Sequence, residues 1–85
     1  MANRFRLTLA QLNPTLGAIS ANSARALAAW EEGRREGTDL VMLTEMFLTG
    51  YQTQDLVLKP AFVADAMAAL AALAARIADG PALGI

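Results

Sequence analysis

The sequence contains neither cysteine nor histidine among its 85 residues. The lack of cysteine excludes disulfides and thiolate metal sites, and it leaves the redox compartment without a sequence signal. Together the two absences exclude, from this stretch of chain, the Ser-His-Asp and Cys-His catalytic sites and the usual zinc ligands. Any chemistry that residues 1–85 contribute must come from other residue types.

A strong charge of one sign is also absent, because 7 Lys and Arg residues stand against 8 Asp and Glu residues. This balance provides no electrostatic footprint for nucleic acid or for an anionic membrane, so neither partner is expected. The N-terminus has no apolar run long enough for a signal peptide. The stretch "AFVADAMAALAALAARIA" is interrupted by Asp65 and Arg76, so no transmembrane helix is predicted and a soluble, cytoplasmic protein is the default.

Apolar residues make up 55% of the sequence and charged residues only 18%. A chain of this length suffices for at most one small domain, and small domains keep much of their surface exposed. The charged residues are few for the surface of a free-standing domain. The composition therefore points to a piece of a larger protein.

The first part of the chain predicts a strand followed by a helix. Phe5, Leu7 and Leu9 alternate with polar residues, which is the period-two pattern of a strand. A helix is expected from about Ser20 or Ala21 to about Glu36, where Gly37 provides a C-terminal stop. The expected core stripe of this helix consists of Ala26, Leu27, Trp30 and Gly33.

The chain continues with a second strand and a second helix. The continuous apolar run Leu40–Leu43 predicts a strand that is buried on both faces. Pro60 can open a helix that Gly80-Pro81 ends. The expected inward face of this helix consists of Ala66, Leu70, Leu73 and Ile77. Residues 82–85 read as the start of a third strand, so we expect the N-terminal part of an α/β domain with right-handed crossovers.

Glu45 follows the apolar strand and lies among apolar residues, which makes it the first candidate for a functional residue. A glutamate just past a strand end is usually solvated or caps a nearby group, and this structural interpretation stays open. Two features favour function. Sites in α/β sheets gather outside the carboxyl ends of the strands. A carboxylate desolvated by neighbours such as Met46 and Phe47 also binds a proton more readily, as a general base near neutral pH must.

Four segments carry a family resemblance. "TEMFLTGY", with "DLVML" before it and "AQLNPTLG" upstream, resembles the first part of the nitrilase, or carbon-nitrogen hydrolase, superfamily. Within it, the continuation "QDLVLKPAF" resembles the glutaminase domains of glutamine-dependent NAD synthetases. The similarity extends over essentially all 85 residues. The flanking segments at the right spacing make the match far more specific than E-x-x-x-T-G-Y alone.

The resemblance implies the N-terminal portion of a nitrilase-type αββα sandwich, incomplete in this chain, and a Glu-Lys-Cys triad. In that family the cysteine attacks the amide carbonyl of glutamine, the glutamate is the general base, and the lysine stabilises the oxyanion. Glu45 matches the glutamate. The lysine and the cysteine are expected beyond residue 85, so residues 1–85 alone should be inactive. Lys59 matches the family's basic residue before the helix-opening proline and not the catalytic lysine.

Three further residues bear on the candidate site. Most of the superfamily has proline before the glutamate, where this chain has Thr44. The change frees φ and restores an N–H donor, which puts the geometry of the turn in question. Tyr51 either lines the substrate pocket or anchors the loop through its hydroxyl, and we favour the anchor. Gln11 is interpreted as a buried hydrogen-bonding residue in preference to a ligand, and no metal- or cofactor-binding residue is predicted in this segment.

For the intact protein the resemblance implies an amidase domain that releases ammonia from glutamine. A C-terminal synthetase domain would use that ammonia, with ATP and magnesium, to amidate deamido-NAD. We expect residues 1–85 to be the N-terminal fragment of the amidase domain, with both remaining parts beyond residue 85 and a homo-oligomer at full length. Two alternatives stay open. One is another nitrilase-family amidase without a synthetase domain, and the other is a small non-enzymatic α/β interaction module.

Overall fold

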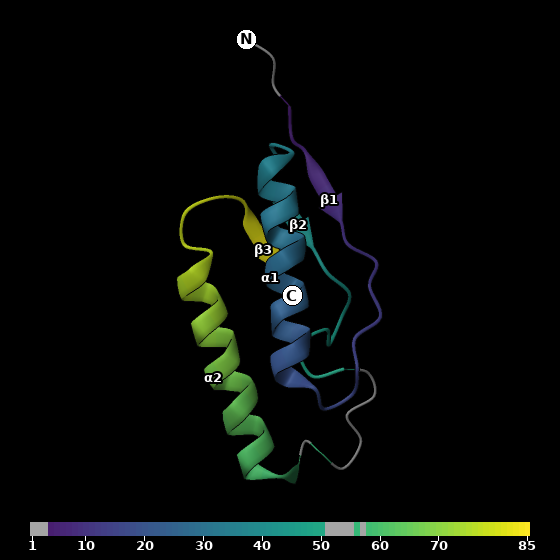
Figure 1. The fold of residues 1–85 in the computed structure, drawn as a ribbon, viewed down its shortest axis with the longest axis vertical. Helices are drawn as coiled ribbons and strands as arrows, with labels where there is room; N and C mark the ends of the chain where they lie inside the picture. The colour runs from purple at the N-terminus through teal and green to yellow at the C-terminus, as the bar shows by residue number, and fades with distance from the viewer. Residues whose placement is uncertain (1–3, 51–55, 57) are drawn as a thin grey trace.

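The computed structural model describes residues 4–50, 56 and 58–85, in which strands and helices alternate (Figure 1). The elements are β1 (Leu7–Leu9), α1 (Ile19–Arg35), β2 (Leu40–Met42), α2 (Pro60–Arg76) and β3 (Ala82–Gly84). The predicted order of strand, helix, strand, helix and strand is confirmed. The first helix begins one or two residues before its expected start and ends one residue before its expected end.

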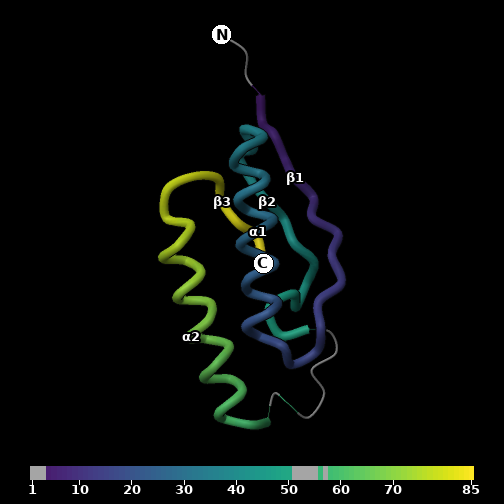
Figure 2. Tube along the Cα trace, in the orientation of Figure 1, coloured from purple at the N-terminus to yellow at the C-terminus, as the bar shows by residue number. Residues whose placement is uncertain are grey.

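The three strands form a parallel sheet in the order β1-β2-β3, with β2 in the centre. Parallel neighbours need long crossover connections, and α1 and α2 provide them. The two helices lie side by side, and the tube in Figure 2 shows the chain returning along each helix to start the next strand. As a result, the carboxyl ends of all three strands lie at one end of the sheet.

Helix α1 packs on the sheet through the predicted stripe. Ala26, Trp30 and Gly33 are buried and Leu27 is half-buried, so this prediction is confirmed. The indole Nε1 of Trp30 donates to the carbonyl oxygen of Pro81 at 2.8 Å. Because a buried N–H without an acceptor is costly, this bond allows a large polar aromatic side chain to sit in the core and ties α1 to the start of β3.

Only one face of the sheet is covered in the described part of the chain. Val41 is buried against α1, whereas Met42, the next residue, is 38% exposed. Leu9 pairs with Met42 and is 67% exposed, and Leu7 on the same face is 48% exposed. We call Leu7, Leu9 and Met42 the open sheet face. The prediction that the second strand is buried on both faces is therefore wrong at Met42, because among the described residues only the α1 side of the sheet is covered.

Helix α2 begins at Pro60 as predicted but is covered less than expected. Leu73 is buried and Ala66 and Ile77 are half-buried, which agrees with the predicted inward face. Leu70 is 39% exposed, so the prediction is wrong at this residue. The reason is that α2 packs mainly against α1, which covers only a narrow stripe of its surface. Within residues 4–50, 56 and 58–85, neither helix is long and apolar enough to span a membrane.

Candidate active site

Glu45 lies three residues after the end of β2, at the carboxyl end of the sheet. The Leu43 N–H still donates to the Gly84 carbonyl oxygen at 2.8 Å, so the central strand leads the chain directly into a turn at residues 45–49. The N–H of Gly50 donates to the Met46 carbonyl oxygen at 2.8 Å and closes this turn. We call residues 45–50 the Glu45 turn. This end of a parallel sheet is where binding and catalytic groups collect.

The surroundings of Glu45 differ from the prediction. Glu45 is exposed, while Phe47 is fully buried and Met46 is half-buried. The expected desolvation of the carboxylate by its apolar neighbours is therefore wrong for the described part of the chain. The reason is the backbone of the turn. With a φ of +56° at Met46, the chain folds back and carries Phe47 inward while Glu45 stays outside.

The Glu45 turn is strained and needs support from the rest of the fold. The left-handed φ at Met46 costs a non-glycine residue roughly 1–2 kcal/mol. Phe47 compensates for this cost by burying its ring in the core. The core cluster that contains Phe47 also includes Ala26, Leu43 and Leu73. Leu43, directly after β2, and both helices thus hold the turn from the inside.

The loop that precedes α1, residues 13–18, holds the same turn through hydrogen bonds. The N–H of Gly17 donates to the Thr49 carbonyl oxygen at 2.8 Å. The side-chain amide of Asn22, near the start of α1, donates to the Leu48 carbonyl oxygen at 3.0 Å. Asn22 was not among the residues predicted from the sequence. The available signal was a polar residue four positions before Ala26, on the buried stripe of α1.

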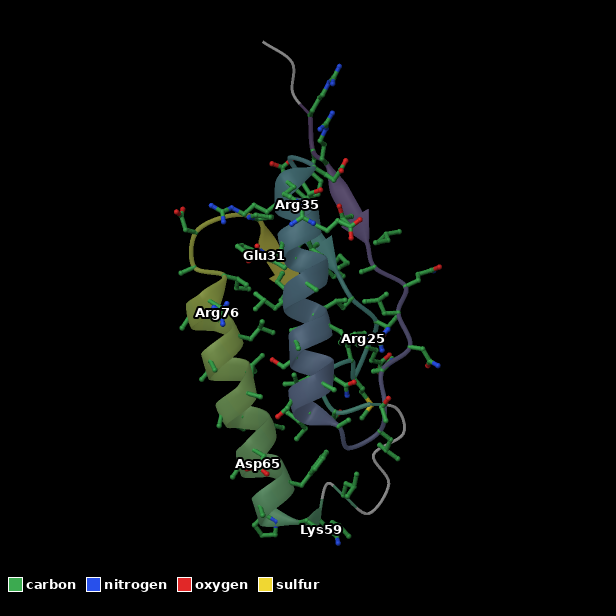
Figure 3. All side chains as sticks on the ribbon, in the orientation of Figure 1. Arg25, Glu31, Arg35, Lys59, Asp65 and Arg76 are labelled. Carbon is green, nitrogen blue, oxygen red and sulfur yellow. The ribbon has the colours of Figure 1, made fainter. Side chains whose placement is uncertain are left out.

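The other residues predicted from the sequence lie apart from Glu45 or outside the described residues. Gln11 is exposed, so its prediction as a buried residue is wrong; it follows β1, which is an edge of the described sheet. Lys59 is the exposed N-cap residue of α2 (Figure 3), directly before the helix-opening Pro60. Thr44 is exposed, and Tyr51 lies outside the described residues. In the part of the chain that the structure describes, no group of three acidic residues comes together to hold a metal ion.

A comparison with known protein families identifies the family of this chain. The model of the carbon-nitrogen hydrolase family matches residues 6–80. The chain therefore belongs to the carbon-nitrogen hydrolase family, as the motifs around Glu45 predicted.

Individual relatives within this family share one description. The chain is 73% identical over 85 residues to the glutamine-dependent NAD(+) synthetase of Rhodobacter capsulatus, a match that covers 100% of this chain and 15% of that protein. It is 45% identical over 60 residues to the enzyme of the same name from Thermotoga maritima, covering 71% of this chain and 10% of that protein. The chain thus spans only a small part of the length of these relatives.

A solved structure confirms the predicted fold class. The crystal structure of a glutamine-dependent NAD(+) synthetase from Cytophaga hutchinsonii matches with a TM-score of 0.77 and 27% sequence identity. The match covers 82% of this chain and 12% of that chain. The strand and helix arrangement of the described residues is therefore a portion of the nitrilase-type α/β fold.

Proposed function

We propose that residues 1–85 form the N-terminal part of the amidase domain of a glutamine-dependent NAD synthetase. The observation that carries the proposal is the 73% identity over all 85 residues to the Rhodobacter capsulatus enzyme of that name. In the proposed protein the amidase domain hydrolyses glutamine to glutamate and ammonia. The remainder of that domain and a synthetase domain follow residue 85, and the synthetase domain uses the ammonia and ATP to amidate deamido-NAD to NAD.

Glu45 is the proposed general base of the amidase. A cysteine from the remainder of the domain attacks the amide carbonyl of glutamine while Glu45 accepts the thiol proton. The proton passes to the departing ammonia, and water then hydrolyses the thioester to glutamate and the free thiol. A lysine from the remainder of the domain stabilises the oxyanion. The support for this role is the position of Glu45 beyond β2 and its exposed carboxylate, which groups from outside the segment can reach.

The other expected ligands are assigned to the whole protein. We assign ATP and magnesium to the proposed synthetase domain and to no residue of this segment. Glutamine and deamido-NAD are the proposed small-molecule substrates. Tyr51, which follows the Glu45 turn in the sequence, is the proposed substrate-binding residue of the segment. The full-length protein is proposed to be a cytoplasmic homo-oligomer.

Substitution of Glu45→Gln in the full-length protein tests this proposal. General base catalysis contributes about 10²–10⁴-fold, so glutamine-dependent NAD formation should fall by at least about 10²-fold. NAD formation with ammonium chloride in place of glutamine should stay at the wild-type rate, because it needs only the synthetase domain. The melting temperature should not fall, because Gln has the size of Glu and residue 45 is exposed.

Three other results would change the conclusion. A parallel fall of both activities and of the melting temperature would make Glu45 a structural residue. A glutamine-dependent rate near wild type would remove Glu45 from the mechanism. Ammonia release from amides without any NAD formation from deamido-NAD would indicate an amidase that lacks a synthetase domain.

A further inference from the structure

We infer that Asn22 is a positioning residue of the proposed amidase, because its side chain holds the Glu45 turn in the place from which Glu45 acts. The inference rests on the proposed function of Glu45. Asn22 lies near the start of α1 and is only 1% exposed, which is unusual for an uncharged polar side chain of this size. A polar group this deeply buried needs hydrogen-bond partners, and the partners identify what the residue does.

Asn22 forms three hydrogen bonds to the backbone of two separate segments. Its Oδ1 accepts from the Thr15 N–H at 3.0 Å. Its Nδ2 donates to the carbonyl oxygens of Thr15 at 2.8 Å and of Leu48 at 3.0 Å. Both N–H donors and the oxygen acceptor of the amide are therefore used. A buried amide with all its groups satisfied has a single orientation, so Asn22 joins the loop before α1 to the Glu45 turn rigidly.

The three hydrogen bonds at this position require a side-chain amide. A carboxylate at residue 22 would accept from the Thr15 N–H but would set two negative oxygens among carbonyl groups. An aliphatic side chain would leave the Leu48 carbonyl and both Thr15 backbone groups without this partner. Only a side chain with one acceptor and two donors satisfies these three groups together.

A second hydrogen bond from the loop before α1 also holds the Glu45 turn. The carbonyl next to that of Leu48, on Thr49, accepts from the Gly17 N–H at 2.8 Å. The loop that contains Gly17 is itself tied to α1, because the guanidinium of Arg25 donates to the Asn13 carbonyl oxygen. Helix, loop and turn therefore form one connected unit in which the Asn22 side chain is the central tie.

The position of this unit matters for proton transfer by Glu45. A general base must lie within about 2.6–3.2 Å of the atom whose proton it takes. The backbone at Met46 is strained by its left-handed φ, so the turn should shift when a hydrogen bond that holds it is removed. A misplacement of about 1 Å can lower a rate by about 10²-fold. Loss of the bond to Leu48 should thus reduce catalysis by Glu45, although Asn22 itself does not contact the substrate.

The test is a double-mutant cycle in the full-length protein with Asn22→Ala, Glu45→Gln and the combination. Asn22→Ala alone should lower the glutamine-dependent kcat by about tenfold to 10²-fold, with little change in KM and none in the ammonia-dependent rate. In the Glu45→Gln background the same substitution should lower the residual rate no further, because residues that act as a unit are not additive.

A control from the same helix separates positioning from general destabilisation. Trp30→Phe removes the bond from α1 to the Pro81 carbonyl but leaves the Glu45 turn untouched. At a temperature below its melting point, this variant should keep the wild-type glutamine-dependent kcat. If Asn22→Ala does not fold, Asn22→Ser replaces it, since serine keeps a small polar side chain at this position but is too short to span to Leu48.

Several outcomes would overturn the inference. They are an equal fold-loss from Asn22→Ala with and without Glu45→Gln, a matching loss in Trp30→Phe, and a parallel fall of the glutamine- and ammonia-dependent rates. Loss of activity in Glu45→Gln but not in Asn22→Ala would refute the role of Asn22 and leave the proposed function intact. A wild-type rate in Glu45→Gln would refute both.

Discussion

Gly50 lies so close to Leu16 that a Cβ atom at residue 50 would overlap the Leu16 backbone, at 2.7 Å from its nitrogen. Gly50 also has a φ of +87°, which L residues rarely adopt. Because Gly50 closes the Glu45 turn, this approach lets the turn and the loop before α1 meet without a side chain between them. Both the conformation and the lack of a side chain are thus required at one residue.

We therefore expect Gly50→Ala to lower the free energy of unfolding of the full-length protein by more than about 2 kcal/mol. The left-handed φ contributes roughly 1–2 kcal/mol, and displacement of Leu16 adds to it. The matched control is Gly17→Ala, which has a φ of +78° but would place its Cβ no closer than 3.7 Å to the Leu56 side chain. Urea unfolding measures both variants, and equal losses would contradict the importance of the close approach.

Thr44→Pro is expected to be tolerated in the full-length protein. Thr44 is exposed, so the substitution removes little packing, and the superfamily most often has proline before the glutamate. Proline restricts the unfolded chain and can stabilise the protein by about 0.4–1 kcal/mol. Thermal or urea unfolding measures the change. A loss of several kcal/mol would show that the Thr44 N–H or hydroxyl makes a hydrogen bond that the fold needs.

Residues 1–85 alone should release no ammonia from glutamine. The segment has no cysteine and thus no thiol nucleophile, and a general base without its nucleophile cannot form the acyl intermediate. A coupled assay for ammonia with the purified segment measures this, with a boiled sample as the control. Ammonia release that scales with the amount of folded segment would contradict the proposed triad.

The isolated segment should self-associate through the open sheet face. Leu9 and Met42 present apolar surface on a small sheet whose outer strands have no further partner among the described residues. Leu9→Lys should therefore reduce the average mass measured by sedimentation at high concentration. The control is Leu58→Lys, because Leu58 is 78% exposed and lies outside the sheet. A monodisperse segment that melts cooperatively as a monomer would refute the prediction.

The secondary structure was largely predictable because local patterns specify it. The spacing of Ala26, Trp30 and Gly33 identified the buried stripe of α1, and Pro60 marked the start of α2. The continuous apolar run before Glu45 identified β2 and so placed the carboxylate at the end of a strand. Each of these signals lies in a few successive residues, so their propensity and spacing can be recognised without knowledge of any tertiary contact.

The sequence alone determined the order of the elements, the family and the position of Glu45 after the central strand. Only the tertiary structure decided which side chains are covered and which distant groups meet. Met42 fits a buried strand by its neighbours but lies on an uncovered face. Asn22 lies on a predictable stripe, yet its partner Leu48 is 26 residues away. Burial and hydrogen bonding depend on which remote segments become neighbours, and no local pattern contains that information.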